Sequence, residues 1–164
     1  MKIVALTQFG TLDTPLRNVR FGVDGTSMFA ELIVEQVIRK PRLVFNLGES
    51  TAQNVLHSGY PVVEGDRLLR LEFEYILAIA ADTDIDVDLF GGLHEAWSDA
   101  PRLHSTKAFY PFLEIVDSPW KKQLPEHRGK DDPDIRHFRI ISAECSVDLL
   151  ATAPSGAWQE NSKN

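Results

Sequence analysis

Three aspartates stand at alternate positions near the middle of the chain, at Asp84, Asp86 and Asp88. Counted from Asp84, this run is followed by Glu95 in the twelfth place, which is the order of the carboxylate ligands in a calcium-binding loop. The sixth place, where such a loop needs glycine for its sharp turn, holds Leu89. Because charged and apolar residues alternate here, we expect a solvated edge strand whose charges discourage pairing with other chains. Calcium binding by Asp84, Asp86, Asp88 and Glu95 is the alternative, and otherwise we expect no cofactor.

Ser50 lies between a short apolar stretch and a stretch of helical character, in the run Gly48-Glu-Ser50-Thr-Ala52. A serine at a tight strand-to-helix turn resembles the nucleophile elbow of the α/β-hydrolases, although the glycine that closes that motif is here Ala52. Ser50 and Gln53 also have the spacing of a capping box, in which each side chain bonds a free backbone N–H at the start of a helix. We therefore interpret Ser50 first as a helix cap, with a catalytic nucleophile as the alternative.

Histidine is the second residue type that could carry catalysis, and the chain has five. No two of them have the H-x-H or H-x-x-x-H spacing that brings two imidazoles to one metal ion from a single element. His94, Glu95 and His104 share a segment with glycine and proline, and catalytic groups often lie in such loops. A small hydrolase-like enzyme that uses this loop or Ser50 is therefore the alternative to a non-catalytic protein.

Two tryptophans stand outside any amphipathic pattern and are candidate interface anchors. Trp120 lies in the run Ser-Pro-Trp-Lys-Lys, and Trp158 lies in a segment with glycine and serine near the end of the sequence. Each could equally fold back to cover an edge of the core. The predicted partner-binding residues are Trp120, Lys121, Lys122, Trp158, Asp84 and Asp86.

The composition is that of an ordinary globular protein. The sequence has 164 residues, a formal net charge of −7 and 43% hydrophobic residues. A negative surface repels phosphate backbones, so we expect no nucleic-acid partner. The longest apolar run, residues 75–81, is far too short to span a membrane, and the single cysteine, Cys145, cannot form an intramolecular disulfide. We therefore expect no membrane association and a cytoplasmic location.

The elements that must position these residues are mostly strands. Between residues 68 and 81, apolar residues fall on alternate positions with charged residues between them, which predicts one long central strand. Residues 2–9 and 17–23 are expected to pair as a hairpin, and residues 137–141 and 147–151 are expected to form another.

The segment 27–40 is expected to be the main helix. Ala30, Ile33, Val34, Val37 and Ile38 follow the spacing of one apolar helix face, and Pro41 would end the helix. Four of these five residues are valine or isoleucine, and because β-branched residues favour strands, a strand is the alternative. Short helices are expected after Ser50 and around Glu95.

Together these elements predict an α+β fold, a mainly antiparallel sheet of about five to seven strands with the helix 27–40 packed on one face. Residues 1–152 are expected to form a single domain, and residues 153–164 a flexible C-terminal tail. The function that we expect is that of a small acidic cytoplasmic binding or accessory protein, such as an inhibitor- or immunity-type factor. It would be non-catalytic and would bind a protein partner that the sequence does not identify.

Overall fold

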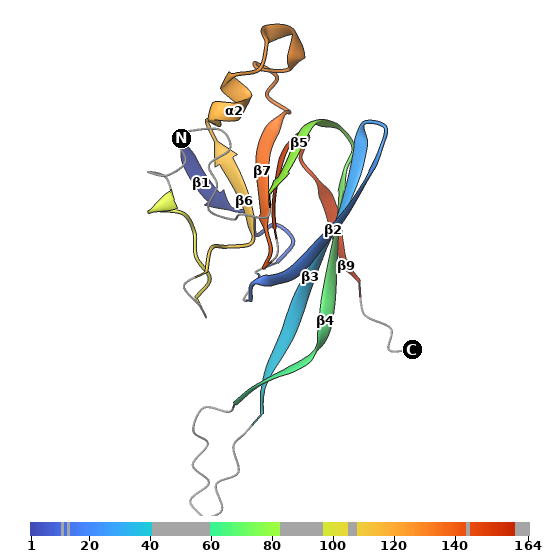
Figure 1. The fold of residues 1–164 in the computed structure, drawn as a ribbon, viewed down its shortest axis with the longest axis vertical. Coiled ribbons are helices and arrows are strands. Elements are labelled where there is room, and N and C mark those ends of the chain that lie inside the picture. The colour runs from blue at the N-terminus through green and yellow to red at the C-terminus, as the bar shows by residue number, and fades with distance from the viewer. Residues whose placement is uncertain are drawn as a thin grey trace, which may run out of the picture.

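The computed structural model describes residues 1–10, 12, 14–40, 60–82, 97–104, 108–143 and 145–159. In these residues the chain forms two sheets whose neighbouring strands are all antiparallel (Figure 1). The five-stranded sheet runs, in order, β1 (Lys2–Ala5), β6 (Phe112–Val116), β7 (Arg136–Ile141), β8 (Ser146–Ala151) and β5 (Ile76–Asp82). The four-stranded sheet runs β2 (Leu16–Asp24), β3 (Ser27–Lys40), β4 (Tyr60–Phe73) and β9 (Ser155–Gln159).

Helices are short in the part of the chain that the structure describes. Helix α2 (Pro119–Lys122) has four residues, and the 3-10 helix η1 (Glu126–Arg128) has three. No helix among these residues has the length and apolar character needed to cross a lipid bilayer.

The predicted α+β class is wrong, because the segment expected to be the main amphipathic helix is strand β3. The segment carries a period of two as well as a helical period, and the buried positions follow the period of two: Met28, Ala30, Leu32 and Val34. On the opposite face, Glu31 forms an ion pair with Arg70, its register partner on β4. Pairing with β2 and β4 on both sides outweighs the local helical pattern, as tertiary context often does.

The extended stretch 68–81 belongs to two strands, although the sequence predicted one. Strand β4 ends at Phe73 and β5 begins at Ile76 in the other sheet, so the chain crosses between sheets at Glu74 and Tyr75. Two backbone hydrogen bonds, from Ile76 N to Thr26 O (2.6 Å) and from Thr152 N to Tyr75 O (3.0 Å), stabilise this crossing between the sheets. The two strands together supply members of both sheets.

The hydrophobic core lies between the two sheets. Phe73 of β4 meets Phe138 of β7 with ring centroids 5.7 Å apart, and Phe138 also contacts Phe112 of β6 at 6.1 Å. These three rings are at most 1% exposed. Because alternate residues of a strand point to opposite faces, the neighbours of Phe138 on β7 point away from this core. That outer face of the five-stranded sheet holds the residues considered below.

Two further expectations concern strand pairing. The predicted hairpin of 137–141 with 147–151 is confirmed, since β7 pairs with β8. The predicted hairpin of the first two strands is wrong, because β1 pairs with β6 while β2 pairs with β3. Within the segment predicted as a C-terminal tail, Ser155–Gln159 forms β9 and pairs with β4.

Candidate functional site

The site begins at a tight turn between strand β6 and helix α2. After β6 ends at Val116, Asp117 takes a left-handed backbone conformation with φ 56°, which is rare for residues other than glycine. Ser118 follows as the N-cap of α2, and its Oγ accepts a hydrogen bond from Lys121 N at 3.1 Å. Pro119 suits the first helical position because its fixed φ fits and no N–H is needed there. This turn fixes the direction of the Ser118 side chain.

Ser118 is one end of a buried chain of polar side chains. Its Oγ lies 2.8 Å from His137 Nδ1, and His137 Nε2 lies 2.8 Å from Asp148 Oδ1. Asp148 Oδ2 lies 3.1 Å from Arg139 Nη2. All four residues are at most 3% exposed. We call Ser118, His137 and Asp148 the Ser–His–Asp array.

The strands explain how these residues meet. His137 and Arg139 stand two positions apart on β7, so both point to the outer face of the sheet. Asp148 of β8 is the register partner of Arg139, and its carboxylate also reaches His137 diagonally. Two tryptophans cover the cluster: the edge of Trp120 meets the His137 ring at 5.3 Å, and the Arg139 guanidinium lies 5.1 Å from the Trp97 ring centre.

The hydrogen bonds of the array have a consistent direction. A carboxylate accepts hydrogen bonds, so the proton between His137 Nε2 and Asp148 Oδ1 belongs to Nε2. In the neutral imidazole with that proton, His137 Nδ1 is an acceptor, and the Ser118 hydroxyl donates to it. This order of donors is that of a serine nucleophile, a base and an orienting carboxylate. The imidazole is reversed relative to the serine proteases, in which Nε2 faces the serine.

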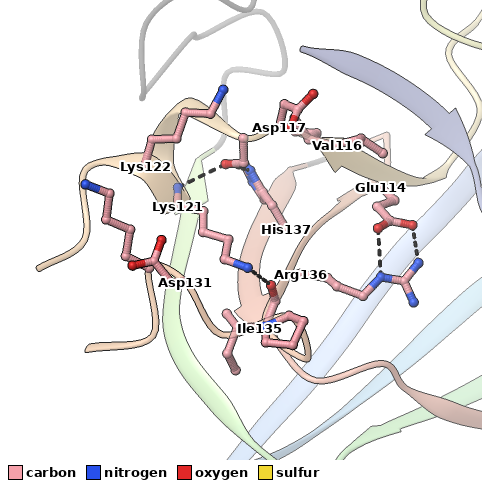
Figure 2. Close-up of a pocket in the computed structure, with 13 residues that line it drawn as sticks. Glu114, Val116, Asp117, Lys121, Lys122, Asp131, Ile135, Arg136 and His137 are labelled. Atoms are coloured by element: carbon pink, nitrogen blue, oxygen red, sulfur yellow. Dashed lines mark hydrogen bonds and ion pairs between the residues drawn. The ribbon is translucent and has the colours of Figure 1, made fainter. Parts of the chain in front are cut away.

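Ser118 and His137 also line a pocket of about 320 Å³, which we call the α2 pocket (Figure 2). It lies between α2, the end of β6, the start of β7 and residues 130–135. Its charged lining residues are the cations Lys121, Lys122, Lys130 and Arg136 and the carboxylates Glu114, Asp117 and Asp131.

Two of the four cations are held by neighbouring groups. The Arg136 side chain forms a two-pronged ion pair with Glu114, with Nε 2.7 Å from Oε1 (Figure 2). This hydrogen bond raises the pKa of Arg136 above its ordinary value, so the guanidinium stays charged. Lys121 Nζ donates to the carbonyl oxygens of Asp132 at 2.5 Å and Ile135 at 2.6 Å, which ties α2 to the start of β7.

The other two cations are in a different state. Lys122 is exposed and Lys130 half-buried, and neither forms an ion pair with any residue that the structure describes. In Figure 2 the Lys122 side chain extends away from the sheet. The α2 pocket therefore carries two cations that form no ion pair with a carboxylate in the described part of the chain.

The predicted partner-binding residues are separated by the fold. Trp120, Lys121 and Lys122 form α2 at one end of the five-stranded sheet, whereas Trp158 lies on β9 of the other sheet (Figure 1). The Trp158 indole donates from Nε1 to the carbonyl of Phe9 at 2.6 Å, so this ring packs back onto the chain. Both tryptophans are half-buried.

Most of the other predicted site residues lie outside the described residues. These are Ser50, Asp84, Asp86, Asp88, His94 and Glu95. His104 is described and is exposed, with the rest of its predicted loop site outside the described part. Within the described ranges, no three or more histidine, cysteine, aspartate or glutamate side chains form a group that could hold a metal ion. The calcium and loop-enzyme hypotheses remain predictions.

The Ser–His–Asp array was missed by sequence reasoning, although one signal was present. Both strands of the last hairpin are strongly apolar, yet His137 and Arg139 interrupt one and Asp148 interrupts the other. Charged residues inside buried strands are rarely unpaired, so the hairpin implied partners for these side chains without showing which residues pair. Comparisons of the chain with protein families, curated proteins and solved structures find no match. Its function therefore has to be argued from these residues.

Proposed function

We propose that this chain is a binding protein whose α2 pocket receives an acidic segment of a protein partner. The observation that carries the proposal is that Lys122 and Lys130 line this pocket without an ion-pair partner among the described residues. The chain as a whole has a net charge of −7, which disfavours anions elsewhere on its surface. A local group of cations on such a surface favours an acidic ligand at that place.

The remaining lining groups limit what kind of anion fits. Asp117 and Asp131 are exposed carboxylates on the same pocket, and they would repel a dense charge such as a polyphosphate. Isolated carboxylates of a peptide fit this mixed lining better. Val116 also lines the pocket and is 38% exposed, so it offers an apolar contact beside the cations. This combination supports an acidic peptide segment, in keeping with a cytoplasmic accessory protein of inhibitor or immunity type.

Titration with short peptides tests this proposal. Acetylated tetraglutamate, tetraglutamine and tetralysine would each be added to the isotope-labelled chain, and amide chemical shifts would be followed by NMR. Tetraglutamate should move the signals of α2 and of residues 130–136, and tetraglutamine should not, because the attraction is between charges. Equal shifts with both peptides, or none with either, would contradict the proposal.

Charge-removing variants assign the binding to the two lysines. Lys122→Gln and Lys130→Gln should each weaken tetraglutamate binding by about two- to fivefold, the usual worth of one exposed ion pair. Arg20→Gln is the matched control, since Arg20 is an exposed cation on β2 of the other sheet. An equal loss in the control would mean that only the total charge matters.

A further inference from the structure

The Ser–His–Asp array is more elaborate than a helix cap requires. To cap α2, Ser118 needs only to accept the bond from Lys121 N, which it does at 3.1 Å. Its hydroxyl proton is directed instead at His137 Nδ1, 2.8 Å away, and the far side of that ring is fixed by Asp148 at 2.8 Å. The cap leaves these two further contacts unexplained.

The surroundings of the array also cost stability that an apolar cluster would avoid. Arg139 and Asp148 are 0% and 1% exposed, and taking two charges out of water is expensive even when they are paired. Apolar residues of similar volume in such positions are often as stable or more stable. The left-handed Asp117 adds backbone strain next to Ser118, and strain of this kind gathers at functional sites.

We infer that Ser118 is a nucleophile that hydrolyses short acyl esters, with His137 as its base and Asp148 as the residue that positions the base. Both Ser118 and His137 line the α2 pocket, which is where a reacting group would enter. This activity goes beyond the proposed binding function and uses the same pocket. The pocket's volume of about 320 Å³ suits a small acyl group, and Ile115, Val116 and Pro133 give it an apolar wall.

The chemistry follows from the direction of the hydrogen bonds. Ser118 Oγ attacks the ester carbonyl carbon while its proton moves to His137 Nδ1, and the imidazolium is stabilised by Asp148 through Nε2. The bond from the carbonyl carbon to the leaving alcohol then breaks, and the alcohol takes the proton from Nδ1. A water molecule attacks the acyl–serine and gives a proton to Nδ1. Release of the carboxylic acid returns that proton to Ser118.

Labelling of the full chain with a fluorophosphonate tests this inference, because the reagent phosphonylates nucleophilic serines. Mass spectrometry of the digested protein should place the adduct on Ser118, and the chain should also hydrolyse p-nitrophenyl acetate. The absence of an adduct on Ser118 in the folded chain would overturn the inference.

Three variants separate catalysis from structure. Ser118→Asn keeps a good helix cap but removes the nucleophile, so the melting temperature should hold while labelling and hydrolysis disappear. His137→Gln should slow labelling at least tenfold. Ser146→Ala removes another buried serine on β8, outside the array, and should leave both rates unchanged. Unchanged labelling in His137→Gln, or hydrolysis that persists in Ser118→Asn, would refute the nucleophile.

This test is independent of the proposed binding function. Tetraglutamate binding should survive in Ser118→Asn, because the lysines that attract the peptide are intact. Labelling of Ser118 should survive in Lys122→Gln and Lys130→Gln, because Lys122 contacts Ser118 through its backbone N–H, which the substitution keeps, and no described contact joins either lysine side chain to the array.

Discussion

Arg139 in the five-stranded sheet and Arg70 in the four-stranded sheet make the same kind of contact in opposite surroundings. Each arginine faces a carboxylate at its register position on the neighbouring strand, Asp148 for one and Glu31 for the other. The Arg139–Asp148 side chains are 0% and 1% exposed, whereas the Arg70–Glu31 side chains are 34% and 21% exposed. The two pairs therefore differ in how well water can solvate one charge when its partner is removed.

That difference decides what each pair does for the protein. Around Arg70 the energy of the pair is small, because water screens both charges and solvates whichever one is left alone. Around Arg139 the surroundings have low polarity, so a charge without a partner is strongly destabilising there. Removing either partner of the buried pair should therefore lower the free energy of unfolding much more than removing a partner of the exposed pair. The buried pair is also linked to His137 and Ser118, whereas the exposed Arg70 forms its ion pairs with Glu31 and Glu72 on the surface of the other sheet. We therefore expect the two sheets to respond very differently to the same substitution.

The largest effect is expected when the buried carboxylate is removed. Asp148→Ala should lower the free energy of unfolding by about 3–5 kcal/mol, because Arg139 would keep a buried charge without its partner. Urea unfolding followed by tryptophan fluorescence measures this loss.

Two variants show whether the lost charge is the cause. Asp148→Asn keeps the size of the side chain and an oxygen that can accept a hydrogen bond from His137 Nε2, but it removes the charge. It should therefore show most of the decrease in the free energy of unfolding expected for Asp148→Ala. Glu72→Ala, which removes an exposed carboxylate from the four-stranded sheet, should cost less than about 1 kcal/mol. A loss below about 1 kcal/mol for Asp148→Ala would mean that the buried pair is not different from the exposed one.

An intermediate effect is expected at the ion pair beside the α2 pocket. The Arg136 side chain is 34% exposed, as much as that of Arg70, and the Glu114 side chain, at 17%, is slightly more buried than that of Glu31, at 21%. Arg136→Gln should lower the free energy of unfolding by about 1 kcal/mol, since a two-pronged arginine–carboxylate pair is stronger than a single contact but is here partly screened.

The pH dependence of this pair has a definite sign. The pKa of Arg136 is raised in the folded chain by its bond to Glu114, so the contribution from this arginine is complete below its ordinary pKa. It is lost only as the pH rises through the still higher folded value. The stability difference between wild type and Arg136→Gln should therefore be constant from about pH 7 to about pH 10. A stability difference that shrinks over this pH range would show that Arg136 is not stabilised by its hydrogen bond to Glu114.

The two sheets were also unequally predictable from the sequence. The final hairpin was predicted correctly because β7 and β8 are close in sequence and strongly apolar. Strand β3 was predicted as a helix because Ala30 and Val34 satisfy both periods, although its partner β2 is adjacent in the sequence. A local pattern is informative when it fits a single period, and it says nothing about contacts between residues far apart in the sequence.

The candidate site depends on contacts between residues that are far apart in the sequence. Ser118 and His137 are 19 residues apart, and they meet because β6 pairs with β7 and α2 folds over the sheet. The sequence marked Trp120, Lys121 and Lys122, which surround Ser118 in this turn, but it gave no reason to relate them to a histidine beyond a long polar segment. The register that places Arg139 opposite Asp148 depends on the connection between β7 and β8, which spacing alone does not determine.

The smallest change in the free energy of unfolding is expected at the exposed Arg70–Glu31 pair. Arg70 contacts Glu31 at 3.0 Å and Glu72 at 3.2 Å, and its guanidinium lies 4.5 Å from the Phe29 ring centre. Arg70→Gln should lower the free energy of unfolding by about 0.2–1 kcal/mol, and about 1 M salt should reduce that loss further because it screens exposed charges. Arg70→Met keeps much of the stem that packs near Phe29, so a larger loss in Gln than in Met would assign the effect to that packing. If the loss at Arg70 approached that of Asp148→Ala and did not change with salt, burial could not be what distinguishes the two pairs.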